Sequence, residues 1–265
     1  MHPVVDILET FGAEGAPERL PGGRGATWRS GDIILKPLDV LPEELAWLDE
    51  VARGRGTANG IRLSLPLRSR SQQLIVDGWT AFPRLEGDHR PGRWLEIAEV
   101  AREFAALFAG VGRPDFLDRR DNAWARADRY AWGEGEGSGP EAAPRVAELV
   151  DARREVADLP GIVHADLAGN VLFAAGLSPA VIDLTVYWRP VGYSIAVVAV
   201  DAVCFEGAPL TLLETISTDR DFPQQLVRAL LFRIVTDWFN GRPADEYGVY
   251  DTAVDRVLEL NSNDR

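Results

Sequence analysis

The segment Ile162–Leu184 constrains the fold of this chain more than any other stretch of its sequence. Its apolar first residues lead into a polar loop, and two short apolar runs then flank the turn Ala-Ala-Gly-Leu-Ser-Pro. Turn residues between two such runs are typical of a β-hairpin. We therefore expect strands over Asn170–Phe173 and Ala180–Leu184, with a loop immediately before them.

Four polar residues occupy this loop and hairpin, namely His164, Asp166, Asn170 and Asp183. Transfer of a phosphoryl group to a hydroxyl needs a carboxylate near the attacking oxygen, and it needs oxygen ligands that hold magnesium against the nucleotide phosphates. An Asp, an Asn four positions later and an Asp after the next strand supply such a set. The alternative is an ordinary hairpin, since Asp and Asn are common at turns.

The same residues carry a resemblance to aminoglycoside, choline and related small-molecule phosphotransferases. That family has a His-Gly-Asp-Leu loop ending in Asn and a hairpin ending in Ile-Asp. The matching positions are His164-Ala165-Asp166-Leu167, Asn170 and Ile182-Asp183. The resemblance implies that Asp166 is catalytic, with His164 bracing the loop or acting beside it, and that Asn170 and Asp183 hold magnesium.

The chain departs from the family pattern at three points. Ala165 replaces the usual Gly, and Asp166 and Asn170 are four positions apart where the family more often has five. The aspartate that the family carries in the following helix has only Asp201 as a candidate here. Whether the shorter spacing supports full catalysis stays open.

Lys36 is the only lysine among 28 basic residues, all others being arginine. A compact ammonium and a planar guanidinium are not equivalent, so a single lysine in this background indicates a position that arginine does not serve. The strand that ends at Lys36 resembles the family strand whose lysine grips the nucleotide phosphates. Its ion-pair partner is expected to be Glu44, with Glu43 and Glu50 as alternatives. A surface charge at a strand end is the other interpretation.

Two further segments match the family loosely. A Gly-Gly-Arg-Gly turn containing Gly23 and Gly25 lies where the fold keeps its phosphate-covering loop, and glycine lets backbone N–H groups approach phosphate oxygens. The connector at residues 83–87 resembles the hinge, where adenine would use the carbonyl of Pro83 and the N–H of Leu85. The resemblance therefore implies a site for ATP.

The expected fold class is α+β, the two-lobed protein kinase-like fold. Residues 1–85 read as a β-rich nucleotide-binding lobe with one main helix that begins at Pro42, and residues 86–265 as a mainly helical lobe for catalysis and substrate, with the hinge at about 83–87. Further strands are expected at Arg62–Leu67 and Leu74–Phe82. The later helices are expected over Pro91–Val111, Arg145–Ala157, Tyr193–Phe205, Phe222–Phe239 and Thr252–Leu260.

Composition narrows the function classes. The formal charge of −13 argues against a nucleic-acid partner. The absence of a long uncharged apolar run predicts no membrane span. The N-terminus lacks the features of a secretory signal, and Cys204 is the only cysteine, so we expect a cytoplasmic location.

We therefore expect an ATP-dependent kinase that phosphorylates a hydroxyl of a small molecule. The acceptor stays open among aminoglycosides, choline-like amines and sugars. A cationic acceptor would suit a cleft lined by acidic residues, and the candidates are Asp88, Asp118, Asp121, Asp128 and Glu206. The alternative function is a catalytically weak or inactive kinase-like protein that binds nucleotide or acts as a scaffold. ATP or GTP preference and oligomeric state are not readable from the sequence.

Overall fold

The computed structural model describes residues 5–20, 25–55, 60–134 and 139–263. The chain packs as two compact units, and each is described by itself. The first unit comprises Met1–His89 and Val171–Leu184, and the second comprises Arg90–Asn170 and Thr185–Arg265. The hairpin expected at 170–184 thus packs with the N-terminal residues, whereas the predicted division at residue 85 assigned it to the second lobe. That division stays a prediction about nucleotide and substrate domains.

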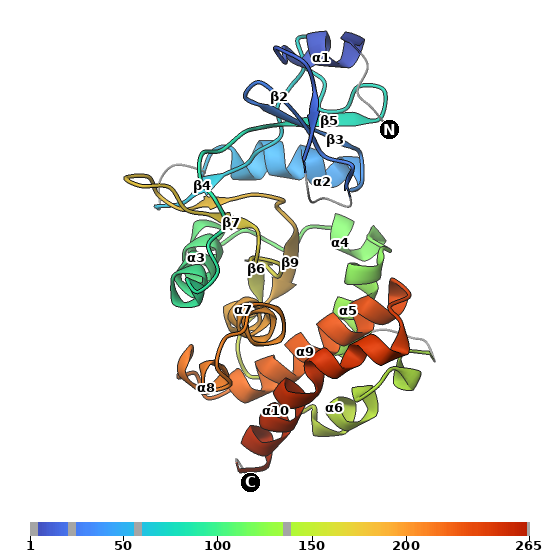
Figure 1. The fold of residues 1–265 in the computed structure, drawn as a ribbon, viewed down its shortest axis with the longest axis vertical. Helices are drawn as coiled ribbons and strands as arrows, with labels where there is room; N and C mark the ends of the chain where they lie inside the picture. Colours follow the sequence, from blue (N-terminus) through green and yellow to red (C-terminus); the bar gives the residue numbers. More distant parts are fainter. Residues whose placement is uncertain (1–4, 21–24, 56–59, 135–138, 264–265) are drawn as a thin grey trace. The chain divides into compact units, whose positions relative to one another are not determined.

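The first unit is built on an antiparallel sheet with the order β1-β2-β3-β5 (Figure 1). Its strands are β1 (Glu18–Arg19), β2 (Trp28–Ser30), β3 (Ile33–Pro37) and β5 (Trp79–Pro83). The turn between β2 and β3 contains Gly31 at φ +57°, where a Cβ would lie 2.9 Å from the carbonyl oxygen of Glu14. Only glycine fits that turn, which explains the sharp hairpin between β2 and β3. β3 and β5 then place Lys36 opposite Thr80.

The helix expected at Pro42 begins there as α2 (Pro42–Trp47). It continues as a π-helical turn, η2 (Leu48–Ala52). Proline suits this first position because its missing N–H would have no partner inside the helix. The π turn was not predicted, and such turns are often found at functional sites. Leu45 and Leu48 are buried, so their face of the helix packs into the interior of the unit.

A second small sheet completes the first unit. β7 (Val171–Leu172) and β8 (Ala180–Val181) form the predicted hairpin, and β8 also pairs in parallel with β4 (Arg62–Leu63). The expected strand at Arg62–Leu67 is therefore shorter than predicted. Its backbone leaves the sheet after Leu63 because the N–H of Leu67 bonds to the carbonyl of Ala81 instead.

The second unit surrounds a two-stranded antiparallel ribbon of β6 (Gly161–His164) and β9 (Val186–Arg189) (Figure 1). Helix α7 (Val191–Phe205) packs against β6, α3 and α9. The remaining helices are α3 (Trp94–Leu107), α4 (Phe116–Arg119), α5 (Ala123–Ala131), α6 (Val146–Ala152), α8 (Leu212–Thr215), α9 (Phe222–Phe239) and α10 (Asp251–Asn263). Because α7 and α9 are buried along most of their length, they form the core of this unit.

The bounds of buried helices agree with those predicted from apolar spacing. Helices whose ends are set by polar contacts differ from the prediction. Helix α9 has the predicted range. Helix α6 ends at Ala152, five residues early, because the backbone N–H of Arg154 donates to the side chain of Gln224 at 2.6 Å. Within the described ranges, none of the helices has both the length and the apolar composition that a bilayer crossing needs.

Candidate functional site

Lys36 and Asp183 are in direct contact in the first unit. The Lys36 ammonium at the end of β3 lies 2.6 Å from Oδ1 of Asp183, which follows β8. The Lys36 side chain is 19% exposed and that of Asp183 is 52% exposed, so water reaches the pair. Asp183 has φ +53°, a left-handed conformation that is uncommon outside glycine. Backbone strain of this kind is concentrated at ligand-binding and catalytic sites.

Further carboxylates surround Lys36. The pKa of Asp39 is raised, first by its loss of hydration and then by the charges of Asp183 and Glu44, while the Lys36 ammonium acts in the opposite direction. Asp39 is an exposed residue, so water screens these charges, and the shift mainly identifies the groups around it. The charges of Lys36, Asp183 and Glu44 are thus all within range of Asp39. Sequence reasoning missed Asp39.

Of the three glutamates considered as partners for Lys36, only Glu44 is buried, at 4% exposure. Its carboxylate also accepts a hydrogen bond from the backbone N–H of Leu41 at 3.3 Å, which ties it to the start of α2. Glu43 and Glu50 are exposed. The structure therefore favours Glu44, and its pairing with Lys36 stays a prediction.

The loosely matched segments have ordinary geometry. Gly25 has φ +67°, and its carbonyl accepts a hydrogen bond from Nε of Arg19 at 2.5 Å. Gly23 lies outside the described residues. Pro83 ends β5 opposite Ile33. Leu85 is half-buried just beyond that strand. Their contacts with adenine and phosphate stay predictions.

In the second unit, the loop after β6 is anchored by His164. This residue is 1% exposed, and its Nδ1 accepts a hydrogen bond from the backbone N–H of Asp166 at 3.1 Å. Its carbonyl accepts a bond from the hydroxyl of Ser194 on α7, and its ring meets Phe104 edge-on at 5.6 Å. A fully buried ring of this kind fixes the loop, so the structure favours the bracing role over the catalytic one.

Asn170 closes the same loop. Its side-chain amide donates to the carbonyl of Asp166 at 2.8 Å and lies 3.4 Å from the carboxylate Oδ2 of that residue. The backbone N–H of Asn170 bonds to Leu167 at 2.9 Å, and Gly169 between them has φ +79°. The short spacing is thus a tight turn that depends on glycine. The amide oxygen of Asn170 is the atom that could bind a metal.

A buried arginine holds the carboxylate of Asp166. Arg233 of α9 donates to Oδ1 of Asp166 at 2.6 Å, and it also forms an ion pair with both carboxylate oxygens of Asp201 on α7. Burial alone would lower the pKa of Arg233, but the charges of Asp201 and Asp166 raise it well above its ordinary value. Burial raises the pKa of Asp201 to about 6.

Asp201 was only a weak candidate in the sequence, and Arg233 was not a candidate. A signal existed, because Asp201 is the only charged residue of the apolar helix α7 and Arg233 lies in a largely apolar stretch of α9. A buried charge needs a partner, so two such positions of opposite sign predict a contact. The structure shows that contact and adds Asp166 to it.

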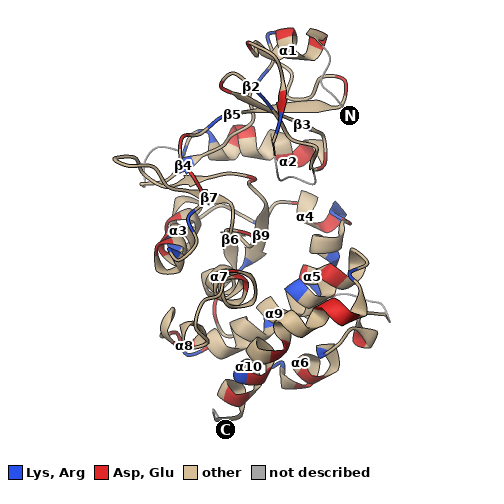
Figure 2. Cartoon of the chain, viewed as in Figure 1, with Lys and Arg blue, Asp and Glu red and all other residues tan. Residues whose placement is uncertain are grey.

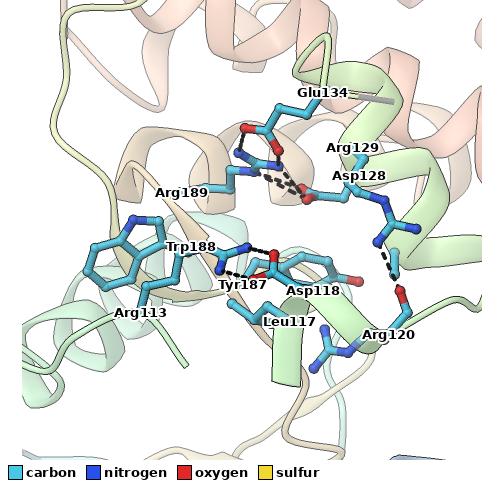
Figure 3. Close-up of a pocket in the computed structure, with 11 residues that line it drawn as sticks. Arg113, Leu117, Asp118, Arg120, Asp128, Arg129, Glu134, Tyr187, Trp188 and Arg189 are labelled. Atoms are coloured by element: carbon cyan, nitrogen blue, oxygen red, sulfur yellow. Dashed lines mark hydrogen bonds and ion pairs between the residues drawn. The ribbon is translucent and has the colours of Figure 1, made fainter. Parts of the chain in front are cut away.

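A cavity of about 290 Å³ lies beside this loop, within the second unit. Figure 3 shows its lining, which comes from α4, α5 and β9 together with neighbouring residues. The lining residues are Arg113, Leu117, Asp118, Arg120, Ala125, Asp128, Arg129, Glu134, Tyr187, Trp188 and Arg189. One wall of the cavity is joined to the strand that leads into the Asp166 loop, because β9 pairs with β6 and places Tyr187 opposite Val163.

The predicted magnesium ligands fit such an ion in their chemistry. Asp183 offers an exposed carboxylate and Asn170 an amide oxygen, and the two belong to different units. The described residues contain no cluster of three or more His, Cys, Asp or Glu side chains arranged to hold a metal. Magnesium at kinase sites is held by one or two carboxylates together with phosphates, so an exposed carboxylate such as that of Asp183 is a suitable ligand type.

Neither a protein-family model nor a curated protein sequence matches the chain. Solved structures do match. Aminoglycoside phosphotransferase from Alicyclobacillus acidocaldarius is similar with a TM-score of 0.60 at 13% identity, over 99% of this chain and 96% of that one. Choline kinase LicA from Streptococcus pneumoniae is similar with a TM-score of 0.60 at 12% identity, over 96% and 98%. The chain has the protein kinase-like fold of these phosphotransferases.

A third match is spectinomycin phosphotransferase in complex with ADP and spectinomycin. Its TM-score is 0.57 at 13% identity, over 97% of this chain and 96% of that one. The predicted fold class is therefore confirmed, with a sheet-rich N-terminal region and a helical C-terminal part. Identities this low leave donor, acceptor and catalytic residues to be argued from the site itself.

Proposed function

We propose that this protein transfers the γ-phosphate of ATP to a hydroxyl group of a small molecule. The observation that carries the proposal is the contact between Lys36 and Asp183. The sequence singled these residues out for separate reasons, 147 positions apart, and their charged atoms are 2.6 Å from each other. The fold is that of phosphotransferases, and one of the similar structures is a complex with ADP.

In this proposal the first unit binds the nucleotide. Lys36 neutralises phosphate oxygens, and Glu44 keeps the ammonium in place from α2. Asp183 exchanges its contact with Lys36 for a magnesium ion, with Asn170 as the second ligand implied by the family resemblance. Magnesium, when bound, would neutralise charge on the phosphates. The pair is suited to this exchange because water already reaches both side chains.

The second unit supplies the group that handles the acceptor. The carboxylate of Asp166 orients the acceptor hydroxyl and accepts its proton as the oxygen attacks. Arg233 fixes the position of that carboxylate, while His164 and Ser194 fix the backbone beneath it. Because phosphoryl transfer depends mostly on positioning and charge, such fixed groups are where the rate is set.

One observation favours the alternative function, a kinase-like protein that binds nucleotide with little or no turnover. Asp166 is already engaged by Arg233 and by the amide of Asn170, so its freedom to turn towards an acceptor hydroxyl is reduced. In this case Lys36 and Asp183 would bind nucleotide while transfer stayed slow. Both functions assign nucleotide binding to the first unit. They differ in whether the second unit supports phosphoryl transfer.

The test combines thermal unfolding with ADP release. A ligand that binds only the folded state at 100 times its Kd adds about 2.7 kcal/mol, so ATP with magnesium should raise the melting temperature. Lys36→Met should remove that rise. Arg29→Met, which alters an exposed arginine on the same sheet, should keep it.

A panel of hydroxyl-bearing acceptors then measures turnover by ADP release. Nucleotide binding with acceptor-dependent release supports the kinase, and binding without release supports the alternative. No stabilisation at millimolar nucleotide would contradict both.

A further inference from the structure

The carboxylates that line the cavity of the second unit are already paired with arginines. Arg189 donates to Asp128 at 2.7 Å and to both carboxylate oxygens of Glu134 at 2.6 and 2.7 Å (Figure 3). Its guanidinium also lies 4.8 Å from the ring centre of Trp132. A cationic ligand would have to share both acids with Arg189. A buried arginine left without its partners is costly.

The third lining acid is paired too, but at the surface. Asp118 accepts two hydrogen bonds from Arg113, at 2.6 and 3.0 Å, and the side chains are 69% and 41% exposed. An exposed pair of this kind contributes little and exchanges partners readily. Arg113 can therefore leave Asp118 for a ligand anion at small cost.

The charge of the lining differs from that of the whole chain. Among the described residues that line the cavity there are four arginines against three acidic side chains, whereas the chain carries a formal charge of −13. One of the four, Arg120, is 3% exposed and lies 5.3 and 5.5 Å from the ring centres of Tyr187 and Phe116. Both signs lie close together on α5 (Figure 2). The cavity thus lacks the excess negative charge that a polycation would require.

Size narrows the ligand further. A volume of about 290 Å³ is at the lower end of ligand pockets, which span about 300–1,000 Å³. Trp188 and Tyr187 add flat apolar surface to the lining, suited to one face of a ring. The space fits a ligand of roughly one sugar ring, and a multi-ring aminoglycoside exceeds it.

The cavity is also within electrostatic reach of the candidate base. Burial raises the pKa of Tyr187, and the charges of Asp128 on the cavity wall and of Asp166 add to that rise. Tyr187, which lines the cavity, is therefore within range of the charge on the loop that carries Asp166. A hydroxyl of a ligand in the cavity could reach towards that loop.

We infer that this cavity is the acceptor pocket, and that its acceptor is a small hydroxylated anion of about one ring, held by Arg113 through a carboxylate or phosphate group. That the ligand is a phosphoryl acceptor rests on the proposed phosphotransferase function. Its binding does not depend on turnover. Such an anion contrasts with the cationic acceptor that the acidic composition suggested. Guanidinium forks are the usual partners of both anions.

The experiment is calorimetric titration with four probes, each with and without ATP and magnesium. Glucuronate carries a carboxylate and glucose 6-phosphate a phosphate, glucose is neutral, and kanamycin is a polycation. We expect at least one of the two anions to bind, at least tenfold more tightly than glucose and kanamycin. Which anion binds identifies the group that Arg113 recognises.

Two substitutions at the surface pair give opposite results. Arg113→Glu should weaken the anion roughly tenfold or more. Asp118→Asn should tighten it about twofold to fivefold, because it frees Arg113. The matched controls are Arg102→Glu and Glu99→Gln on α3, an exposed pair whose side chains are 38% and 67% exposed, and these should change nothing.

The inference is overturned if neither anion binds, if kanamycin or glucose binds as well as the anions, or if Asp118→Asn weakens binding. Its failure is distinct from failure of the proposed function. Anion binding without ADP release in the presence of any acceptor leaves the pocket in place and removes the kinase. ADP release driven by a cationic acceptor keeps the kinase and removes the anion pocket.

Discussion

Lys36 in the first unit and Arg233 in the second are both cations held beside a carboxylate proposed to act in the reaction, but water reaches them differently. Lys36 is 19% exposed and its partner Asp183 is 52% exposed. Arg233 is 11% exposed, and its partners Asp166 and Asp201 are 36% and 7% exposed. An exposed pair contributes little and can exchange partners, while a buried arginine with two carboxylates holds one geometry. The chain therefore keeps an exchangeable cation where nucleotide is proposed to bind and a fixed one beneath the proposed base.

The largest effect is expected from Asp166→Asn. Loss of the proton acceptor should lower turnover by roughly 10²–10⁴, the usual contribution of general acid–base catalysis. Stability should hardly change, because Asp201 still pairs with Arg233. The measurements are acceptor-dependent ADP release and the melting temperature, with the exposed Asp151→Asn of α6 as the control. Unchanged turnover would remove Asp166 from its proposed role.

Arg233→Met tests the fixed cation of the second unit. It leaves two carboxylates without their cation, one of them buried, and such a loss costs about 3–5 kcal/mol of unfolding free energy. Urea unfolding measures it, with the exposed Arg102→Met as the control, for which we expect little change.

A double substitution at the same place separates the effect of the unpaired charge on stability from the effect of the lost anchor on turnover. Arg233→Met with Asp201→Asn removes the buried uncompensated charge, so it should recover part of the lost stability. It should not recover turnover, because Asp166 still lacks its anchor. If the single substitution costs no more than Arg102→Met, the buried triad is not what holds the second unit's loop.

Lys36→Arg tests the exchangeable pair of the first unit, Lys36 with Asp183. The change should be nearly silent for stability, since the pair is reached by water and the chain uses arginine everywhere else. The wider planar group should shift bound phosphate, and a misplacement of about 1 Å can cost roughly 10²-fold in rate. Values of kcat/KM for ATP and melting temperatures check this, with Lys36→Met expected to be weaker still. Wild-type activity in Lys36→Arg would end the argument from the single lysine.

The two sides also differ in how far the sequence predicted them. Lys36 and Asp183 follow short strands whose hairpins are visible as local patterns, so residue type and order were enough. Arg233 lies 67 positions from Asp166, and nothing local connects them. The parallel pairing of Arg62 with Ala180 was invisible for the same reason. Contacts set by packing over such distances depend on the whole fold.

The order of elements and most helix cores were likewise predicted from apolar spacing, whereas ends set by side-chain contacts were not. Helix α6 stops early because Gln224, far along the chain, accepts from the Arg154 backbone N–H. The cavity lining was predicted least well. Asp118 and Asp128 were candidates to line a cleft for a cationic substrate, but each is paired with an arginine.

The smallest expected effect is on the pH dependence of the rate. It links the rate to the buried triad that Arg233 forms with Asp201 and Asp166. Burial raises the pKa of Asp201 to about 6, so this carboxyl is ionised above that pH and neutral below it. When it is neutral, Arg233 has only Asp166 as a charged partner and binds that carboxylate more strongly. A carboxylate held more tightly by Arg233 is less free to take up the position that an acceptor hydroxyl needs. We therefore expect kcat/KM to fall by up to about tenfold per pH unit below pH 6, towards a plateau.

Asp201→Asn imitates the neutral form, so it should be slow at all pH values and lack this limb. Rate profiles of both proteins between pH 5 and 8, with circular dichroism to confirm that they stay folded, make the measurement. An unchanged acid limb in Asp201→Asn would show that another group titrates, and the buried triad would then be structural rather than part of the pH response.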